Sequence, residues 1–157
     1  MKYYPVGLNI AGKNVLVVGA GCVAERKIKT LRMFGANLFV VAPKATSYIT
    51  RLSKKGLIRF FKRRYLASDI RRARLVIAAT SDEKTNEKVS EDAKKRNIPV
   101  NVVDRTAICE FISPAIIRRG DLVVAVSTDA KDPPLSKSFK EFLEERIDEF
   151  YRDRNKP

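Results

Sequence analysis

The chain has 157 residues, of which 45% are hydrophobic, so it is long and apolar enough to fold as one domain with a short appendage and is not a disordered chain. It carries 32 lysine and arginine residues against 18 aspartate and glutamate residues, which gives a formal net charge of +14. It has no histidine, which excludes His-ligated zinc, a Ser-His-Asp triad and a Cys-His dyad. The two cysteines, Cys22 and Cys109, form neither a Cys₄ site nor a disulfide scaffold, so no metal site is expected.

The surplus of positive charge would attract an anion such as nucleic acid, a membrane surface or a small polyanion, although it also fits a solvated, heat-tolerant surface. The basic residues are spread over the sequence and match no nucleic-acid motif, so no nucleic-acid partner is expected. The sequence has no apolar signal peptide at its start and no apolar run near the roughly 18 residues of a membrane span. We therefore expect a cytoplasmic protein without a membrane partner.

Short apolar runs rich in β-branched residues alternate with helical patterns over the first two thirds of the chain. These runs lack an alternating polar face, which is typical of parallel strands covered on both sides. The predicted strands are residues 15–18, 38–42, 58–61, 75–79 and 100–103. The predicted helices are residues 22–34, which end at Gly35, and residues 83–96, which Ser81 or Asp82 caps. This order predicts β-α-β units with right-handed crossovers.

The pattern changes near residue 110. Residues 110–118 and 122–126 flank the turn 119–121, which contains a glycine, and this arrangement predicts a β-hairpin. The chain is then interrupted at 132–134, and residues 136–152 form an amphipathic helix whose apolar face needs a partner.

The expected fold class is therefore α/β. We expect a Rossmann-like parallel-sheet domain over residues 1–110, followed by a β-hairpin segment with a C-terminal helix over residues 111–157.

A glycine turn, Gly19 to Ala24, lies between the first predicted strand and the first predicted helix. It reads G-x-G-x-x-A, a permitted form of the dinucleotide fingerprint. Gly19 would allow the tight turn, Gly21 the close approach of a pyrophosphate, and Ala24 the packing of helix on strand. The helix N-terminus would offer unpaired N–H groups to the phosphates. The alternative is a tight structural turn without a ligand.

The acidic residue that usually binds the adenosine ribose is missing. The second strand is followed by Pro43 and Lys44, so backbone or small groups there would meet the ribose, and Lys44 could favour a 2′-phosphate. The choice between NAD and NADP therefore stays open.

Two more predicted strands are followed by residues that could line the same cofactor site, because ligands bind at the carboxyl ends of strands in open α/β sheets. Ala79 and Thr80 follow one of them and would lie beside the cofactor, whether or not the next residues also cap a helix. Asp104 follows the last strand, where a carboxylate could take or position a proton, or could simply cap the next turn.

In the order in which they occur, these segments resemble one family, precorrin-2 dehydrogenase, the dehydrogenase module of siroheme synthases. The resemblance runs from residue 4 to about residue 135. The matching blocks are 15–28 (VLVVGAGCVAERKI), 40–43, 75–86 (LVIAATSDEKTN), 101–104 (NVVD) and 111–128 (FISPAIIRRGDLVVAVST).

The resemblance implies NAD-dependent oxidation of precorrin-2 to sirohydrochlorin, in which a hydride goes to nicotinamide and the tetrapyrrole loses protons. It implies that Asp104 is the general base and that the protein is a homodimer through the segment after the nucleotide-binding domain. Whether this chain also inserts iron or cobalt, as some members do, is left open. The cofactor contacts that it implies are Gly21, Cys22, Val23, Pro43, Lys44 and Thr80.

The substrate is a polycarboxylate, which suits the net charge and the pair Arg118 and Arg119, because arginine binds carboxylates with two hydrogen bonds. The resemblance adds Ser127 and Thr128 as substrate contacts. The family usually has glycines after this pair, whereas this chain has Asp129 and Ala130.

Two other functions are weighed against the dehydrogenase. One is a module of the same fold that senses NAD without catalysis, because fold does not determine function. The other is a nucleic-acid binder, for which the overall charge is the only support.

Overall fold

The computed structural model describes residues 2–103 and 105–154. Its contacts divide the chain into two compact units, Pro5–Phe111 and a second unit that comprises residues 2–4 and 112–154 of the described chain. Each unit is described by itself below.

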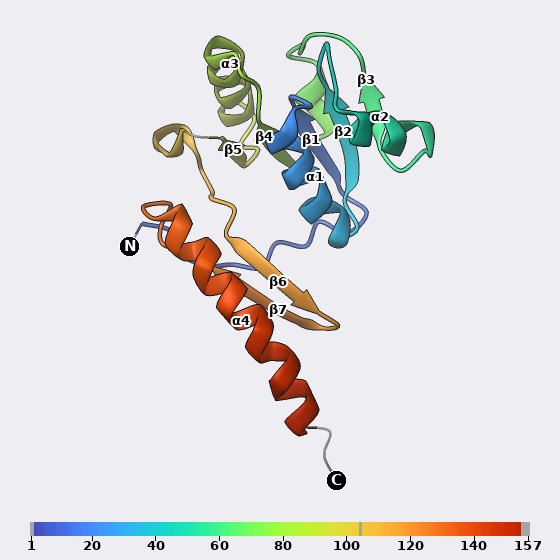
Figure 1. Cartoon of the computed structure of the whole chain (residues 1–157). Coiled ribbons are helices and arrows are strands. Elements are labelled where there is room, and N and C mark those ends of the chain that lie inside the picture. Colours follow the sequence, from blue (N-terminus) through green and yellow to red (C-terminus); the bar gives the residue numbers. More distant parts are fainter. Residues whose placement is uncertain (1, 104, 155–157) are drawn as a thin grey trace. The chain divides into compact units, whose positions relative to one another are not determined.

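The first unit contains a five-stranded sheet in which all strands are parallel (Figure 1). The strand order is β3-β2-β1-β4-β5, so β1 is the central strand, with β2 and β3 on one side and β4 and β5 on the other, as in a Rossmann fold. The strands are β1 (Asn14–Val18), β2 (Asn37–Val41), β3 (Arg59–Phe61), β4 (Leu75–Ala78) and β5 (Val100–Val102). All five predicted strands are therefore present, within one residue at each end.

Helices cover both faces of this sheet, which explains why its strands read as unbroken apolar runs. They are α1 (Cys22–Met33), α2 (Ser47–Lys54) and α3 (Glu83–Lys94), together with the 3₁₀ turns η1 (Asp69–Arg72) and η2 (Thr106–Ile108). Ile28 of α1 and Ile49 of α2 are fully buried with one face of the sheet, and Val89 of α3 and Ile70 of η1 with the other. Each β-branched strand residue thus packs against a helix on its own side.

The second unit is a hairpin with one long helix alongside it (Figure 1). The antiparallel strands β6 (Ala115–Arg119) and β7 (Leu122–Val126) pair in register from Ala115 opposite Val126 to Arg119 opposite Leu122. The helix α4 (Pro133–Arg154) packs on both strands, and Ile117 and Ile147 are buried in this unit. The predicted fold class, an α/β Rossmann-like sheet followed by a hairpin and a C-terminal helix, is confirmed.

The structure corrects the start of α4. The helix begins at Pro133 and not at residue 136, because proline suits the first position of a helix, where its missing N–H group needs no partner. Asp132 caps this end, since its carboxylate accepts a hydrogen bond of 2.8 Å from the Leu135 N–H group. The segment 132–134 therefore starts the helix.

The first arm of the hairpin is also shorter than predicted, because residues 110–114 are not part of β6. The Glu110 N–H group donates to the Val100 carbonyl at 3.0 Å, and the Asn101 side chain donates to the Phe111 carbonyl at 3.0 Å. Glu110 and Phe111 are therefore tied to β5 and end the first unit.

None of the helices in the described ranges combines the length and the apolar character needed to cross a membrane.

Candidate cofactor site

The glycine turn joins three neighbouring strands at their carboxyl ends. The Gly19 N–H group donates to the Val41 carbonyl at 2.9 Å, which links the turn to the end of β2. The Ala79 N–H group donates to the Val18 carbonyl at 2.8 Å, which links the end of β4 to β1. The turn thus lies where the strand order reverses, the point at which open α/β sheets bind ligands.

Gly19 has a φ of +107°, which L-residues with a side chain rarely adopt. A Cβ atom at this position would overlap the Ala79 carbonyl oxygen and lie 2.6 Å from the Ala79 carbonyl carbon. Glycine is therefore required here by backbone packing, because β4 ends directly against the turn.

Gly21 differs, because its φ is −83° and a Cβ atom added to it would meet no protein atom within 4 Å. The space in front of Gly21 is open, and this residue caps α1 without any side-chain hydrogen bond. The N–H groups of Cys22, Val23 and Ala24 have no acceptor within the described ranges. This end of α1 therefore fits an anionic group such as the pyrophosphate of a dinucleotide.

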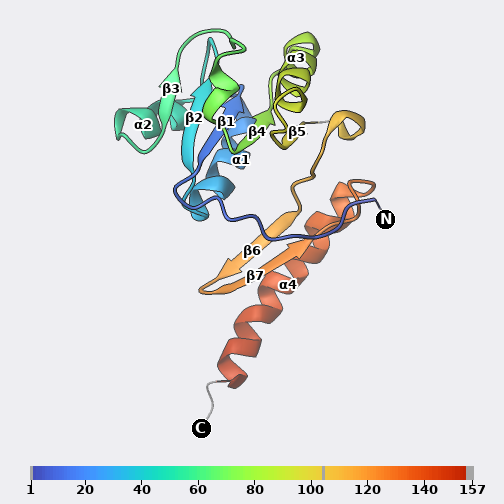
Figure 2. The same cartoon turned by 180° about the vertical axis from the view of Figure 1, so that it is seen from behind.

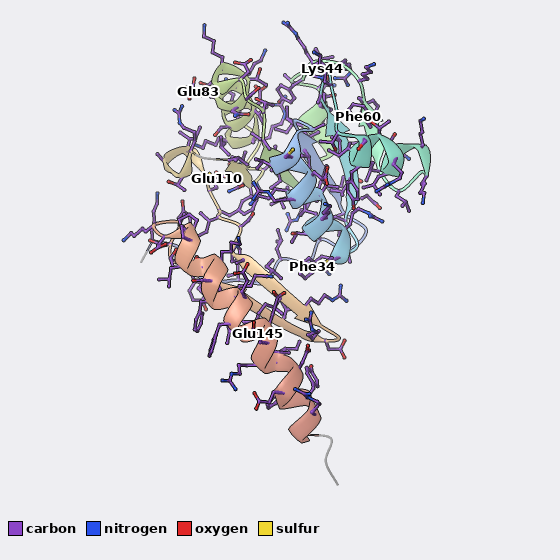
Figure 3. All side chains as sticks on the ribbon, viewed as in Figure 1. Phe34, Lys44, Phe60, Glu83, Glu110 and Glu145 are labelled. Atoms are coloured by element: carbon purple, nitrogen blue, oxygen red, sulfur yellow. The ribbon has the colours of Figure 1, made fainter. Side chains whose placement is uncertain are left out.

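Ala24 is fully buried against the sheet, which brings α1 close to β1, whereas Cys22 is exposed and Val23 is half-buried. The turn is also tied to the loop after β2, since the Thr46 N–H group donates to the Ala20 carbonyl at 3.0 Å. Pro43 and Lys44 lie in that loop and are both exposed. Lys44 lies at one end of the first unit and Phe34, just after α1, at the other (Figure 3).

Thr80 follows β4 and is held by Asn86 in the first turn of α3. The Asn86 side chain accepts from the Thr80 N–H group at 3.2 Å and donates to the Thr80 carbonyl at 3.0 Å. Its oxygen also lies 2.8 Å from Thr80 Oγ1. Asp82 caps α3, because its carboxylate accepts from the Lys84 N–H group and from the Thr85 hydroxyl. The hydrogen bond from the Thr85 hydroxyl, together with the one from the Lys84 N–H group, holds the pKa of Asp82 below its usual range.

The sequence analysis missed Asn86 as a functional residue. No signal in the sequence marks it, because its burial and its bonds to Thr80 depend on the position of α3 beside the end of β4.

Asp104 lies outside the described residues, but its neighbours on both sides are anchored. The Val103 N–H group donates to the Ala78 carbonyl at 2.9 Å. The Arg105 guanidinium lies 3.4 Å from a carboxylate oxygen of Glu83 and 3.1 Å from one of Glu87, both on α3. Val103 is therefore tied to β4 and Arg105 to α3, at the same edge of the sheet as Thr80.

Cys109 packs against the end of β5, a second feature that was not predicted from the sequence. It is 8% exposed, accepts from the Val102 N–H group at 3.0 Å and lies 3.1 Å from the Val102 carbonyl and 3.3 Å from the Arg105 carbonyl. Its thiol thus ties the η2 segment to the end of β5.

The expected substrate residues lie at opposite ends of the hairpin. Arg118 and Arg119 are next to its tip, where the Arg119 side chain lies 3.3 Å from the Asp148 carboxylate on α4. Ser127 and Thr128 follow Val126, which is four register steps from the tip, about 14 Å along the strands. The structure therefore does not bring these two pairs together.

Thr128 orders the loop between β7 and α4. Its hydroxyl lies 2.8 Å from the Asp132 carbonyl, 3.1 Å from the Asp132 N–H group and 3.0 Å from the Ser136 hydroxyl. Ser127 is exposed, and its hydroxyl accepts from the Asp129 N–H group at 3.2 Å.

Asp129 and Ala130 both have a φ of +61°, so this loop keeps a backbone that favours glycine although its residues are not glycine. The Asp129 carboxylate accepts from the N–H groups of Lys2 and Tyr3 at 2.9 and 3.1 Å. These bonds hold the pKa of Asp129 below its usual range. Figure 2 shows the N-terminal end of the chain beside this loop.

No group of three or more cysteine, aspartate and glutamate side chains suited to a metal ion is present in the part of the chain that the structure describes.

The chain is similar to known proteins in both sequence and fold. Residues 6–115 match the family described as "Putative NAD(P)-binding". A siroheme synthase of Pseudomonas putida (strain W619) is 43% identical over 151 residues, which cover 96% of this chain and 32% of that protein. The siroheme synthase of Pseudoalteromonas atlantica is 39% identical over 147 residues, or 94% of this chain and 32% of that protein. The chain thus spans about a third of the length of these curated relatives.

Among solved structures, SirC, a precorrin-2 dehydrogenase, superposes with a TM-score of 0.78 and 33% identity over 92% of this chain and 71% of that one. The apo-structure of D-lactate dehydrogenase from Escherichia coli, with a TM-score of 0.50 and 15% identity over 66% of this chain and 32% of that one, shares the fold alone. The chain belongs to the NAD(P)-binding family whose model it matches, and its predicted kinship with the precorrin-2 dehydrogenases and siroheme synthases is confirmed.

Proposed function

We propose that this chain oxidises precorrin-2 to sirohydrochlorin with NAD as the acceptor, a step of siroheme synthesis. The observation that carries the proposal is the extent of the likeness to SirC, which covers 92% of this chain and therefore extends beyond the unit that contains the sheet into the second unit. A shared nucleotide-binding unit alone would support only cofactor binding.

The residues at the glycine turn would hold the cofactor. Gly19 gives the turn its shape, and Gly21 leaves room for the pyrophosphate, which the free N–H groups of Cys22, Val23 and Ala24 would bind. Pro43 and Lys44 would meet the adenosine ribose, while Ala79 and Thr80 would border the nicotinamide half. When bound, the nicotinamide supplies the acceptor for the hydride.

Asp104 is the proposed general base, which takes a proton from the tetrapyrrole. Most of the rate would come from holding the ring and the nicotinamide in a reactive geometry. Two features support this role, namely the contacts of the described neighbours Val103 and Arg105 with β4 and α3, and the place of Asp104 in the sequence just after β5.

For the substrate carboxylates we propose Arg118, Arg119 and Ser127 as contacts, with Thr128 shaping the loop that presents Ser127. The arginine pair and Ser127 would meet different carboxylates at the rim of a large ring, since they lie about 14 Å apart along the hairpin. Metal insertion into the product is not part of this proposal.

We also propose that the protein is a homodimer and works in the cytoplasm. Four side chains of α4 are about half exposed and favour a partner surface, namely Leu135 at 53%, Phe139 at 48%, Phe142 at 51% and Phe150 at 57%. Both cysteines are free, which suits a reducing compartment.

The substitution Asp104→Ala tests the chemistry. Turnover of precorrin-2 should fall at least a hundredfold, as expected for loss of a general base, while NADH binding stays within twofold of the wild type. If turnover is retained, Asp104 is not the base. If wild-type protein binds NADH but never converts precorrin-2, the chain is an NAD-sensing module.

A further inference from the structure

The end of β2 is basic where a dinucleotide fold that prefers NAD usually has an acid. The loop after Val41 reads Ala-Pro-Lys-Ala-Thr-Ser and contains no carboxylate. An acid at this place binds the 2′-hydroxyl of the adenosine ribose, whereas a basic residue accommodates the 2′-phosphate of NADP. Lys44 is such a basic residue and is exposed (Figure 3).

A second lysine follows the neighbouring strand. Val41 pairs with Phe61, and the Ala42 N–H group donates to the Phe61 carbonyl at 3.2 Å, so β2 and β3 end side by side. Lys62 comes directly after Phe61 and is exposed. Because neighbouring strands are about 4.8 Å apart, the loops that carry Lys44 and Lys62 leave the sheet close together.

Neither lysine is paired with an acidic side chain of the described residues. No ion pair of Lys44 or Lys62 occurs within residues 2–103 and 105–154. The Asp69 carboxylate pairs with the Arg63 guanidinium, with N···O distances of 2.8 and 2.6 Å, and also accepts a hydrogen bond from the Leu66 N–H group. The basic charge of the two lysines is thus uncompensated.

One carboxylate, that of Glu25, does approach the loop after β2. One of its oxygens pairs with Lys29 at 2.7 Å and the other accepts from the Thr46 hydroxyl at 2.8 Å. Glu25 is therefore neutralised by Lys29 and its oxygens are engaged, so it does not replace the missing ribose acid.

We propose that Lys44 and Lys62 form a subsite for the 2′-phosphate of NADP, so that this chain binds NADP(H) as well as NAD(H). The inference rests on the proposed cofactor site and extends it to a second cofactor. A phosphate monoester carries about 1.5 to 2 negative charges at neutral pH, which two unpaired lysines would balance.

Equilibrium titrations of the purified chain with NADH and with NADPH, followed by cofactor fluorescence and without precorrin-2, test this subsite. The wild type should bind NADPH within about tenfold of NADH. Lys62→Ala should weaken NADPH binding by about fivefold, the value of one exposed ion pair, and leave NADH binding within twofold. Lys44→Ala, which also removes a residue beside the adenosine ribose, should weaken NADPH binding by about fivefold more than NADH binding. The control Lys55→Ala removes the same charge at the other end of α2 and should change neither affinity.

The outcomes separate the two proposals. If NADH binds but NADPH binds more than a hundredfold more weakly, or if the two lysine variants weaken both cofactors equally, the subsite is absent. If neither cofactor binds, the proposed cofactor site itself is wrong. Added salt should weaken NADPH binding more than NADH binding, because the 2′-phosphate contact is electrostatic.

Discussion

The two glycines of the turn should respond in opposite ways to the same added methyl group. Gly19→Ala forces a side chain onto a φ of +107° and against the Ala79 backbone. The backbone strain costs about 1–3 kcal/mol. The displacement of the end of β4 costs a similar amount, about 1–3 kcal/mol. We expect the free energy of unfolding to fall by about 4 kcal/mol, a large part of the 5–15 kcal/mol typical of a domain.

Gly21→Ala adds its methyl group to open space at a φ of −83°. The loss of a good helix cap and the reduced entropy of the unfolded chain nearly cancel, so stability should change by less than about 1 kcal/mol. The methyl group would, however, lie between the pyrophosphate and the free N–H groups of α1. NADH binding should therefore weaken at least tenfold.

Urea unfolding and NADH titration of both variants measure these effects. With a urea dependence of about 2 kcal/mol per molar, Gly19→Ala should move the unfolding midpoint down by about 2 M, and Gly21→Ala should leave it nearly unchanged. The reasoning is refuted if Gly21→Ala binds NADH like the wild type. It is also refuted if Gly19→Ala has the stability of the wild type.

Three further changes test the supporting structure. Asn86→Ala removes the bonds that hold Thr80 and should lower the free energy of unfolding by about 2–3 kcal/mol in urea, whereas a change below 0.5 kcal/mol would contradict this anchor. Ala130→Gly relieves a φ of +61° and should raise the free energy of unfolding by up to about 1 kcal/mol; any loss of stability would contradict the strain. Asp69→Asn should destabilise the protein at pH 7, and its difference from the wild type should shrink in acid. Burial opposes ionisation of Asp69, but bonds from Arg63 and Leu66 lower its pKa overall, so its stabilisation is present above the unfolded pKa and is lost as the pH falls through the folded pKa. A difference that is constant from pH 7 to 3 would exclude this pair as the cause.

The sheet and the glycine turn could be predicted from sequence because each rests on a local rule. Buried parallel strands require uninterrupted β-branched runs, and a turn packed against β4 requires glycine at position 19. Helix α2 had no comparable signal. Its eight residues bury only Ile49 and Leu52, too few to give a helical period, and its cap at Thr46 is apparent only with the structure.

The rest of the site depends on contacts between segments far apart in the sequence. Asn86 is recognisable as an anchor only once α3 lies beside the end of β4, and Lys62 joins Lys44 only through the register of β2 and β3. The separation of Arg118 from Ser127 likewise follows from the hairpin register, because the pairing sets how far each residue lies from the tip. Composition and spacing carry none of this information.

Hydride transfer from precorrin-2 to a nicotinamide cofactor can be followed in an anaerobic absorbance assay, in which purified protein receives enzymatically generated precorrin-2 together with NAD, with NADP or with neither. Sirohydrochlorin should form only when a nicotinamide cofactor is present, with one reduced cofactor for each product molecule. Conversion at the same rate without a cofactor, or none at all while NADH is bound, would contradict the proposed function.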